Sequence, residues 1–169
     1  MNVGFRPLRT DDLRTLHEWL QRPHVRNWWT ERRTYDQVVE HYLPAIEGRE
    51  PTDLYLILLD EQPGGFIQTY LVSAYPEYQK LVGVEDDVAG VDLFLADPAL
   101  TGRGLGSQAL AQFVNDVVFS TATTRACIAD PDAENTASLR AFERAGFTRV
   151  RDFVDPSDGR LHTLMRRDR

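Results

Sequence analysis

Three glycines at alternate positions form a candidate ligand-binding loop in this sequence. Gly102, Gly104 and Gly106 lie between an expected strand and an expected helix. Glycine lets the backbone come close to a ligand, and the free N–H groups at the start of a helix favour an anion, so the natural ligand is a phosphate or a pyrophosphate. No Lys-Ser/Thr pair follows the last glycine, which excludes a P-loop, and the third glycine comes one position too early for the dinucleotide fingerprint. A tight strand-to-helix turn without a ligand is the competing interpretation of these glycines alone.

The other reactive side chains form no metal or nucleophile pattern. Cys127 is the only cysteine, which excludes an intrachain disulfide and a thiolate zinc cluster, and its place in an expected strand favours a small core residue over a nucleophile. The histidines have no metal-ligand spacing and no carboxylate cluster around them, so surface or structural roles are expected for His17, His24, His41 and His162. We therefore expect no metal.

These residues must be positioned by an α/β fold. The expected strands are 5–9, 54–59, 65–72, 90–96, 125–129, 147–154 and 161–165. Helices are expected after Thr10, after Thr34 with an interruption near Pro44, after the glycines, and over 135–145, whereas 73–89 has the pattern of a long surface loop. Strands alternate with helices, but hairpins occur in the middle and at the end, which predicts a mixed sheet and excludes an all-parallel one.

Length and charge narrow the class of protein. A chain of 169 residues has the length of one domain, so a single domain over 1–169 is expected. The formal charge of −7 counts against nucleic acid or an anionic membrane as the partner and favours a cationic one. No apolar run is long enough to span a membrane, no signal peptide is visible, and the single cysteine suits a reducing compartment, so we expect a cytoplasmic protein. The sequence leaves open whether it is a monomer or a homodimer.

Two segments together resemble the GNAT superfamily of acyl-CoA-dependent N-acetyltransferases. Arg103-Gly104-Leu105-Gly106 opens an expected helix. The segment 135–147 is more specific, because its Asn, the small residue three positions later and its aromatic-Glu-basic-x-Gly-Phe ending are all in register. The resemblance implies a central mixed, mostly antiparallel sheet, flanked by helices, whose fourth and fifth strands splay apart.

The resemblance also implies acetyl-CoA as co-substrate. Its pantetheine arm would pair with the fourth strand as an added strand does, through main-chain contacts of Phe94 and Leu95. Asn135 would bond the arm from the other side. The pyrophosphate would lie in the glycine loop, formed by Arg103, Gly104, Leu105, Gly106 and Ser107.

Within the superfamily the chain most resembles the aminoglycoside 6′-N-acetyltransferases. The segments that carry this resemblance follow one another along nearly the whole chain: 16–20, Trp28-Trp29, 40–44, 65–70, Gly90-Val91-Asp92 and Asp130-Pro131. The resemblance implies that Asp92 is the catalytic base for attack of the 6′-amine on the thioester. An unperturbed aspartate, with a pKa of about 3.9, is a poor base, so the mechanism predicts partial burial of Asp92 or a second carboxylate beside it, for which Asp130 is the candidate.

A polyamine sugar requires carboxylates for its ammonium groups and flat aromatic faces for its rings. Asp130, together with Glu85 and Asp86 in the long loop, is expected to supply the charge. Aromatic and polar contacts are expected from Trp29, Tyr70 and Gln68. The competing interpretation is that the acidic run is a solvated loop tip and that the tryptophan belongs to the core.

One departure from the superfamily pattern bears on mechanism. Phe142 stands where many members have a tyrosine that protonates the leaving thiolate, so a side-chain acid is in doubt. Three alternatives to an aminoglycoside acetyltransferase stay open, and Phe142 is the feature that keeps the last of them open. The first is an N-acyltransferase for a hydroxylysine-type siderophore precursor, although such enzymes are expected to have a histidine near the acyl-transfer centre, where Asp92 stands here. The second is an acetyltransferase for protein N-termini. The third is a module that binds acyl-CoA or a drug without turnover.

Overall fold

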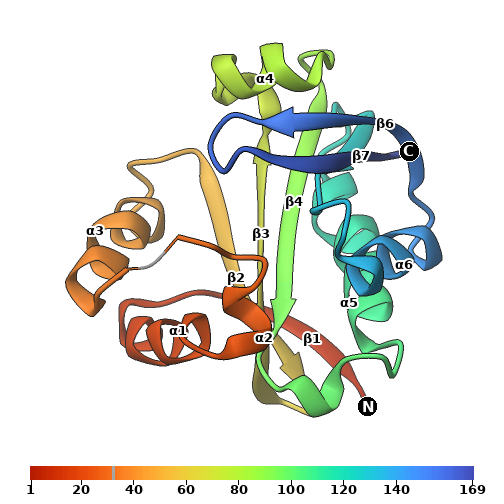
Figure 1. The fold of residues 1–169 in the computed structure, drawn as a ribbon. Coiled ribbons are helices and arrows are strands. Elements are labelled where there is room, and N and C mark those ends of the chain that lie inside the picture. Colours follow the sequence, from red (N-terminus) through yellow and green to blue (C-terminus); the bar gives the residue numbers. More distant parts are fainter. Residues whose placement is uncertain (32) are drawn as a thin grey trace. The chain divides into compact units, whose positions relative to one another are not determined.

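A computed structural model describes residues 1–31 and 33–169. Its strands form one mixed sheet with the hydrogen-bonded order β1-β2-β3-β4-β5-β7-β6 (Figure 1). The chain divides into two compact units, one of residues 1–68 and 93–100, the other of residues 69–92 and 101–169. Strands β3 (Gln62–Leu71) and β4 (Val88–Leu95) therefore contribute to both units.

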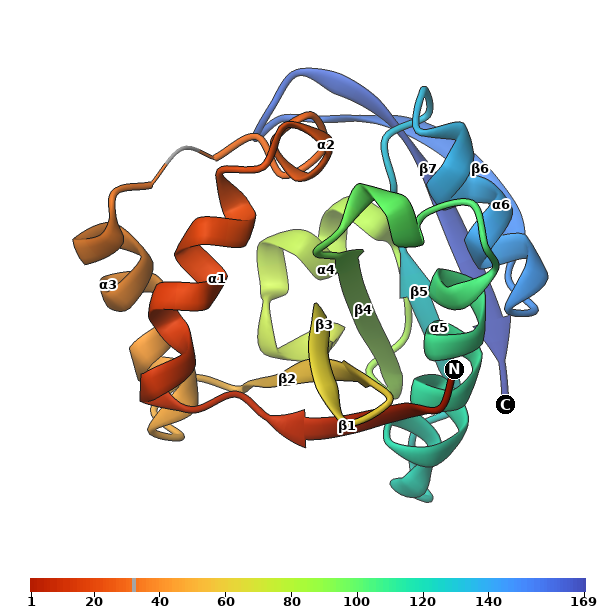
Figure 2. The ribbon, with the colours of Figure 1, turned by 90° about the horizontal axis from the view of Figure 1, so that it is seen from below.

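The first unit contains the antiparallel pair β1–β2 and, among its described residues, three helices. Strands β1 (Val3–Pro7) and β2 (Thr52–Leu59) pair antiparallel, with Val3 opposite Leu59. The helices are α1 (Leu13–Leu20), α2 (Pro23–Arg26) and α3 (Tyr35–Ile46), and 3-10 turns cover Thr10–Asp12 and Pro98–Leu100. Helices α1 and α3 pack against each other (Figure 2). The apolar spacing of the first helix is the reason, since Leu13 and Leu16 are fully buried.

Aromatic rings form much of the core of the first unit. Phe66 and Phe94 are buried with their ring centroids 5.7 Å apart. Trp29 meets both edge-on, at 5.8 Å and 5.2 Å respectively. Trp19 and Tyr42 complete the cluster from α1 and α3. Edge-to-face packing of this kind adds stabilisation beyond the buried area.

The second unit contains the parallel pair and the C-terminal hairpin. Strand β5 (Ala126–Ala129) pairs parallel with β4 and antiparallel with β7 (Arg160–Asp168), which forms a hairpin with β6 (Thr148–Asp155) (Figure 1). Its helices are α4 (Pro76–Val82), α5 (Leu105–Asp116) and α6 (Thr136–Arg144), with 3-10 turns at Val72–Ala74 and Val118–Ser120. The predicted mixed, mostly antiparallel sheet is thus confirmed.

Two local predictions were wrong, and one helix was not predicted. Residues 73–89 are not one irregular loop, because α4 runs from Pro76 to Val82 and is capped by Gly83, whose φ of 67° is left-handed. A helix of about two turns is too short to show a period in the sequence. Pro44 does not interrupt α3, which continues to Ile46, so the missing N–H of the proline is tolerated in the last turn. Helix α2 was not predicted, since its four residues carry no pattern.

A helix that crosses a membrane needs about 20 mostly apolar residues. None of the helices formed by the described residues is that long and apolar.

Candidate active site

The point where β4 and β5 stop pairing organises the site. Their parallel ladder begins at Val88 opposite Ala126 and ends at Gly90 opposite Ile128, although β4 continues to Leu95. Asp92 and Asp130 each lie two residues beyond the last pair. Because register partners in a parallel pair face the same side and side chains alternate along a strand, the two carboxylates belong to the same face of the sheet.

Asp92 is in the interior of its strand. It is the fifth of the eight residues of β4 and half-buried, and it lies in the part of β4 that extends past the pairing with β5. The partial burial that a base requires is present.

Tyr70 lies on the same face, held there by a glycine. A Cβ atom added to Gly90 would come within 2.5 Å of the Tyr70 ring, so the ring lies directly against the strand backbone. Any side chain at position 90 would push it away. The glycine therefore brings Tyr70 onto the face that carries Asp92.

A second tyrosine links this face to Asp130. The Tyr78 hydroxyl donates a hydrogen bond of 2.7 Å to Oδ1 of Asp130, and the Tyr70 and Tyr78 rings are 6.2 Å apart. Burial, followed by the nearby charges that include Asp92 and Asp130, raises the pKa of both tyrosines well above 10. Both phenols are thus protonated at neutral pH, and both stand within electrostatic reach of the two carboxylates. Asp92 and Asp130 thus both act electrostatically on Tyr70, which was predicted for the site, and on Tyr78, which was not.

His162 is the residue of this cluster that sequence reasoning missed. Its Nδ1 lies 2.7 Å from the backbone oxygen of Asp130 and 3.2 Å from Oδ2 of the same residue. Its Nε2 lies 2.8 Å from Oδ2 of Asp158. No sequence signal could have found it, because residues 130 and 162 are brought together only by the packing of β5 against β7.

The same cluster has the composition of a metal site but the bonding of an ion pair. Asp130, Asp155 and His162 offer ligand atoms within 4.8 Å of one another. Both ring nitrogens of His162 face oxygen acceptors, however, and a histidine that donates from both nitrogens has no lone pair for a metal. The cluster is better described as an imidazolium among carboxylates.

Several acidic side chains expected to meet substrate already have partners. Arg166 donates to Glu85 at 3.0 Å, and Gln79 donates to Asp86 at 2.8 Å. Asp132, which follows Asp130, is buried and forms an ion pair of 2.8 Å with Arg160. A substrate ammonium group would have to compete with these contacts.

The glycine loop has the geometry expected of an anion site. Gly102 and Gly104 have left-handed φ values of 74° and 80°, and a Cβ added to either would meet no atom within 4 Å. Gly104 is the N-cap of α5, so no capping side chain covers the first N–H groups of this 12-residue helix. Ser107 donates its hydroxyl to the Gly104 carbonyl at 2.9 Å, and Arg103 is exposed beside the loop.

The remaining predicted residues have structural surroundings of their own. Asn135 is the N-cap of α6, since its side chain accepts a hydrogen bond of 3.1 Å from the Ser138 N–H. The Leu95 carbonyl lies 2.9 Å from Nε2 of His24, and the Phe94 ring is in the aromatic core of the first unit. Trp29 packs against that core, as the competing interpretation held, while Gln68 is half-buried in β3.

Phe142 is a core residue. It is 3% exposed, and its ring meets that of Phe147 edge-on at 5.1 Å. Helix α6 therefore supplies no hydroxyl at this position, in agreement with the departure noted in the sequence.

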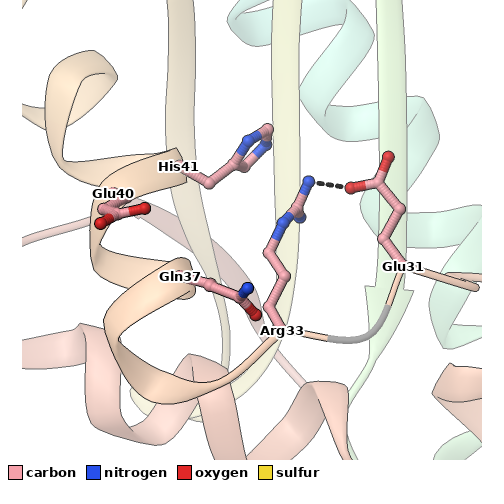
Figure 3. Close-up of a pocket in the computed structure, with 5 residues that line it drawn as sticks. All are labelled: Glu31, Arg33, Gln37, Glu40 and His41. Atoms are coloured by element: carbon pink, nitrogen blue, oxygen red, sulfur yellow. Dashed lines mark hydrogen bonds and ion pairs between the residues drawn. The ribbon is translucent and has the colours of Figure 1, made fainter.

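A separate open pocket of about 520 Å³ lies in the first unit, along α3 and the segment before it (Figure 3). The pocket is lined by the ion pair of Arg33 with Glu31 and by the polar side chains of Gln37, Glu40 and His41. Burial lowers the pKa of His41, and the positive charge of Arg33 lowers it further, so this imidazole is neutral near pH 7. None of the residues predicted for the chemistry lines this pocket.

Known proteins resemble the chain along almost its whole length. Residues 9–154 match the acetyltransferase (GNAT) domain model. The chain is 28% identical over 169 residues to aminoglycoside N(6′)-acetyltransferase type 1 of Klebsiella pneumoniae, a match that covers 98% of this chain and 84% of that protein. It is 27% identical over 148 residues to lysine N-acyltransferase MbtK of Mycobacterium tuberculosis (strain ATCC 25618 / H37Rv), covering 85% and 67%. The crystal structure of AAC(6′)-Ib with coenzyme A and kanamycin matches with a TM-score of 0.89 at 29% identity, covering 99% of this chain and 95% of that one.

Proposed function

This chain belongs to the GNAT acetyltransferase family, and from that premise we propose that it transfers the acetyl group of acetyl-CoA to the 6′-amino group of aminoglycosides. The observation that carries the proposal is the pair Asp92 and Asp130, which lie beyond the last β4–β5 pair on one face of the sheet. Similarity to an aminoglycoside N(6′)-acetyltransferase and to a structure that contains coenzyme A and kanamycin supports it.

Acetyl-CoA would supply an activated acetyl thioester, and the residues of the glycine loop fit its anionic part. The open left-handed glycines and the N-terminus of α5 favour a pyrophosphate between Arg103 and Ser107. Main-chain groups of Phe94 and Leu95 would contact the pantetheine arm, with Asn135 as a further contact. Because Asn135 uses its oxygen to cap α6, its side-chain N–H₂ is the group that would serve.

Asp92 would act on the amine. Its carboxylate attracts and orients the substrate ammonium, then takes a proton directly or through water, so that the neutral amine can attack. The C–N bond forms as the C–S bond breaks, the nitrogen gives up its second proton to water, and the coenzyme leaves as a thiolate that takes a proton from water. Because Phe142 cannot donate a proton, we assign no side-chain acid to the thiolate.

Asp130 would bind a neighbouring amine of the substrate, and the half-buried ring of Tyr70 would lie against the sugar. Glu85, Asp86, Trp29 and Gln68 remain proposed substrate contacts, with the first two dependent on exchange of their present partners. Acetylation removes a positive charge from the drug, so resistance to aminoglycosides is the proposed consequence. The need for acetyl-CoA supports a cytoplasmic location.

Release of coenzyme A thiol tests the activity. The purified protein is mixed with acetyl-CoA and kanamycin or tobramycin, and the product is mapped by NMR to the acetylated nitrogen. We expect thiol release that depends on both substrates and acetylation at the 6′-nitrogen. Turnover of another amine without any turnover of 6′-amino aminoglycosides would overturn the proposal.

A second candidate is supported by the similarity to lysine N-acyltransferase MbtK. Such an enzyme is expected to use a histidine near the acyl-transfer centre. His162 does lie beside Asp130, but its two nitrogens both donate hydrogen bonds, so it holds a proton and cannot serve as a base. The same assay with a lysine substrate and a longer acyl-CoA distinguishes the two candidates.

A further inference from the structure

We propose that His162 and Tyr78 are positioning residues that hold the Asp130 carboxylate, as an anion of fixed orientation, for an ammonium group of the substrate. The inference rests on the proposed function, because it assigns Asp130 to substrate binding. It adds two residues that the chemistry of the reaction does not itself require.

The geometry around Asp130 carries the inference. Tyr78 donates to Oδ1 at 2.7 Å, while His162, whose Nδ1 is hydrogen-bonded to the Asp130 backbone oxygen at 2.7 Å, forms an ion pair of 3.2 Å with Oδ2. The carboxylate side chain is 13% exposed and that of His162 is 12% exposed. A hydrogen bond at one oxygen and an ion pair at the other oppose rotation of the carboxylate, and low exposure strengthens both interactions.

The charge of His162 follows from its partners. Nδ1 faces only the backbone and side-chain oxygens of Asp130, and Nε2 faces Asp158, so both nitrogens must carry hydrogen. The hydrogen bond with Asp130, opposed by burial and aided by Asp158, raises the pKa of His162 to about 10. Asp155 also faces the cluster, and the ring of Phe153 packs beside the imidazole at 6.0 Å. At neutral pH an imidazolium therefore lies beside the Asp130 side chain.

The backbone holds both sides of this contact. The Thr163 N–H donates to the Pro131 carbonyl and the Ala133 N–H to the Leu161 carbonyl, each at 2.9 Å. Asp132 and His162 accordingly form a β-bridge. Side-chain substitutions at His162 therefore leave the main-chain attachment intact, and the variants are expected to fold.

Steady-state kinetics of His162→Asn and Tyr78→Phe tests the inference. Asparagine keeps a donor near the position of Nδ1 but loses the charge and the bond to Asp158, and phenylalanine loses only the hydroxyl. We expect the KM for kanamycin to rise about tenfold in each, because Tyr78→Phe removes a hydrogen bond to a charged group and His162→Asn removes the positive charge beside it, while the KM for acetyl-CoA stays constant. Because the wild type loses the imidazolium only as the pH rises towards about 10, its kcat/KM should fall between pH 8 and 10 by more than that of His162→Asn, which carries no charge at this position.

Matched controls exclude a general effect of these substitutions. His17→Asn and Tyr55→Phe make the same changes in the first unit and should leave both KM values and the pH profile unchanged. Circular dichroism and thermal melting check that all four variants fold. If the wild type acetylates kanamycin and His162→Asn and Tyr78→Phe keep its KM and pH profile, the positioning role is wrong and the proposed function stands. If the wild type acetylates no aminoglycoside, both are wrong.

Discussion

At the scale of single residues, the site depends on the environment of a few acidic and phenolic groups. Asp92 is half-buried on the face that holds Tyr70, whereas the Asp130 side chain accepts a hydrogen bond from Tyr78 and forms an ion pair with His162. Two carboxylates in different environments can divide the tasks of base and anchor. The residue types were visible in the sequence, but the contacts that would divide their roles were not.

Replacement of Asp92 separates chemistry from binding. Asp92→Asn keeps the size of the side chain but removes the base, so kcat should fall about 100- to 10,000-fold, the usual contribution of a general base. Acetyl-CoA binding, measured by isothermal titration calorimetry, should be unchanged. Near-normal turnover would remove Asp92 from the role of base.

The protonation of His162 also predicts how stability depends on pH. Its pKa is about 10 in the folded protein, above the roughly 6.5 of an unfolded histidine, so its contribution is fully present below about pH 6.5 and is lost as the pH rises to about 10. The melting temperature should therefore fall, by on the order of 5 °C, across this window. His162→Asn should lose most of this dependence, and an identical decline in the variant would contradict the assignment.

At the scale of elements, glycines set the distances between strands, helices and ligands. Gly90 lets the Tyr70 ring lie on β4, and Gly104 lets the chain turn into α5 without a side chain over the helix N-terminus. The two positions require glycine for different reasons. At Gly90 there is no space for a side chain, and at Gly104 the backbone is left-handed.

Gly90→Ala tests the space beside β4. The added methyl group would lie 2.5 Å from the Tyr70 ring, so the ring must move, at a cost of about 1–3 kcal/mol in unfolding free energy. The KM for kanamycin should rise as well. Gly4→Ala is the matched control, because its nearest neighbour would be an ordinary contact of 3.9 Å to Leu58.

Gly104→Ala tests the anion site. Alanine in a left-handed conformation costs about 1 kcal/mol, and the strained loop should bind coenzyme A at least several-fold more weakly. Gly48→Ala has a similar φ, 75°, and also meets nothing within 4 Å, so it should cost similar stability without loss of coenzyme affinity. Equal affinities in the two variants, measured by calorimetry, would argue against a pyrophosphate in this loop.

At the scale of the whole molecule, the acidic residues behind the net charge of −7 differ in their surroundings. Part of the acidity is compensated locally, by Arg166 at Glu85 and by Arg160 at Asp132, while Asp92 and Asp130 lie on one face of the sheet. The net negative potential should still attract a polycation over distances of about a Debye length.

Salt dependence tests this long-range effect. Raising the ionic strength from about 0.02 to 0.3 M should increase the KM for kanamycin several-fold, because screening weakens attraction between the acidic protein and the polycation. The kcat should change little, since the bound complex is already formed. A KM for kanamycin that is independent of salt would show that the net charge does not assist binding.

The sequence by itself determined the local features: the apolar face of α1, the capping box of α3, the glycine turn into α5 and the family motifs. Each of these depends on residues a few positions apart, and such patterns survive without knowledge of the fold. It also placed Asp92 in one expected strand and Asp130 directly after the next.

Only the tertiary structure decided how these pieces meet. The contact of His162 with Asp130, the position of Tyr70 on Gly90 and the ion pair of Glu85 with Arg166 join residues distant in the chain. Such contacts depend on strand register and on which face each residue occupies, and a shift of one residue would reverse them. For that reason the acidic residues could be recognised in the sequence, whereas which of them are held by a cation or a phenol could not.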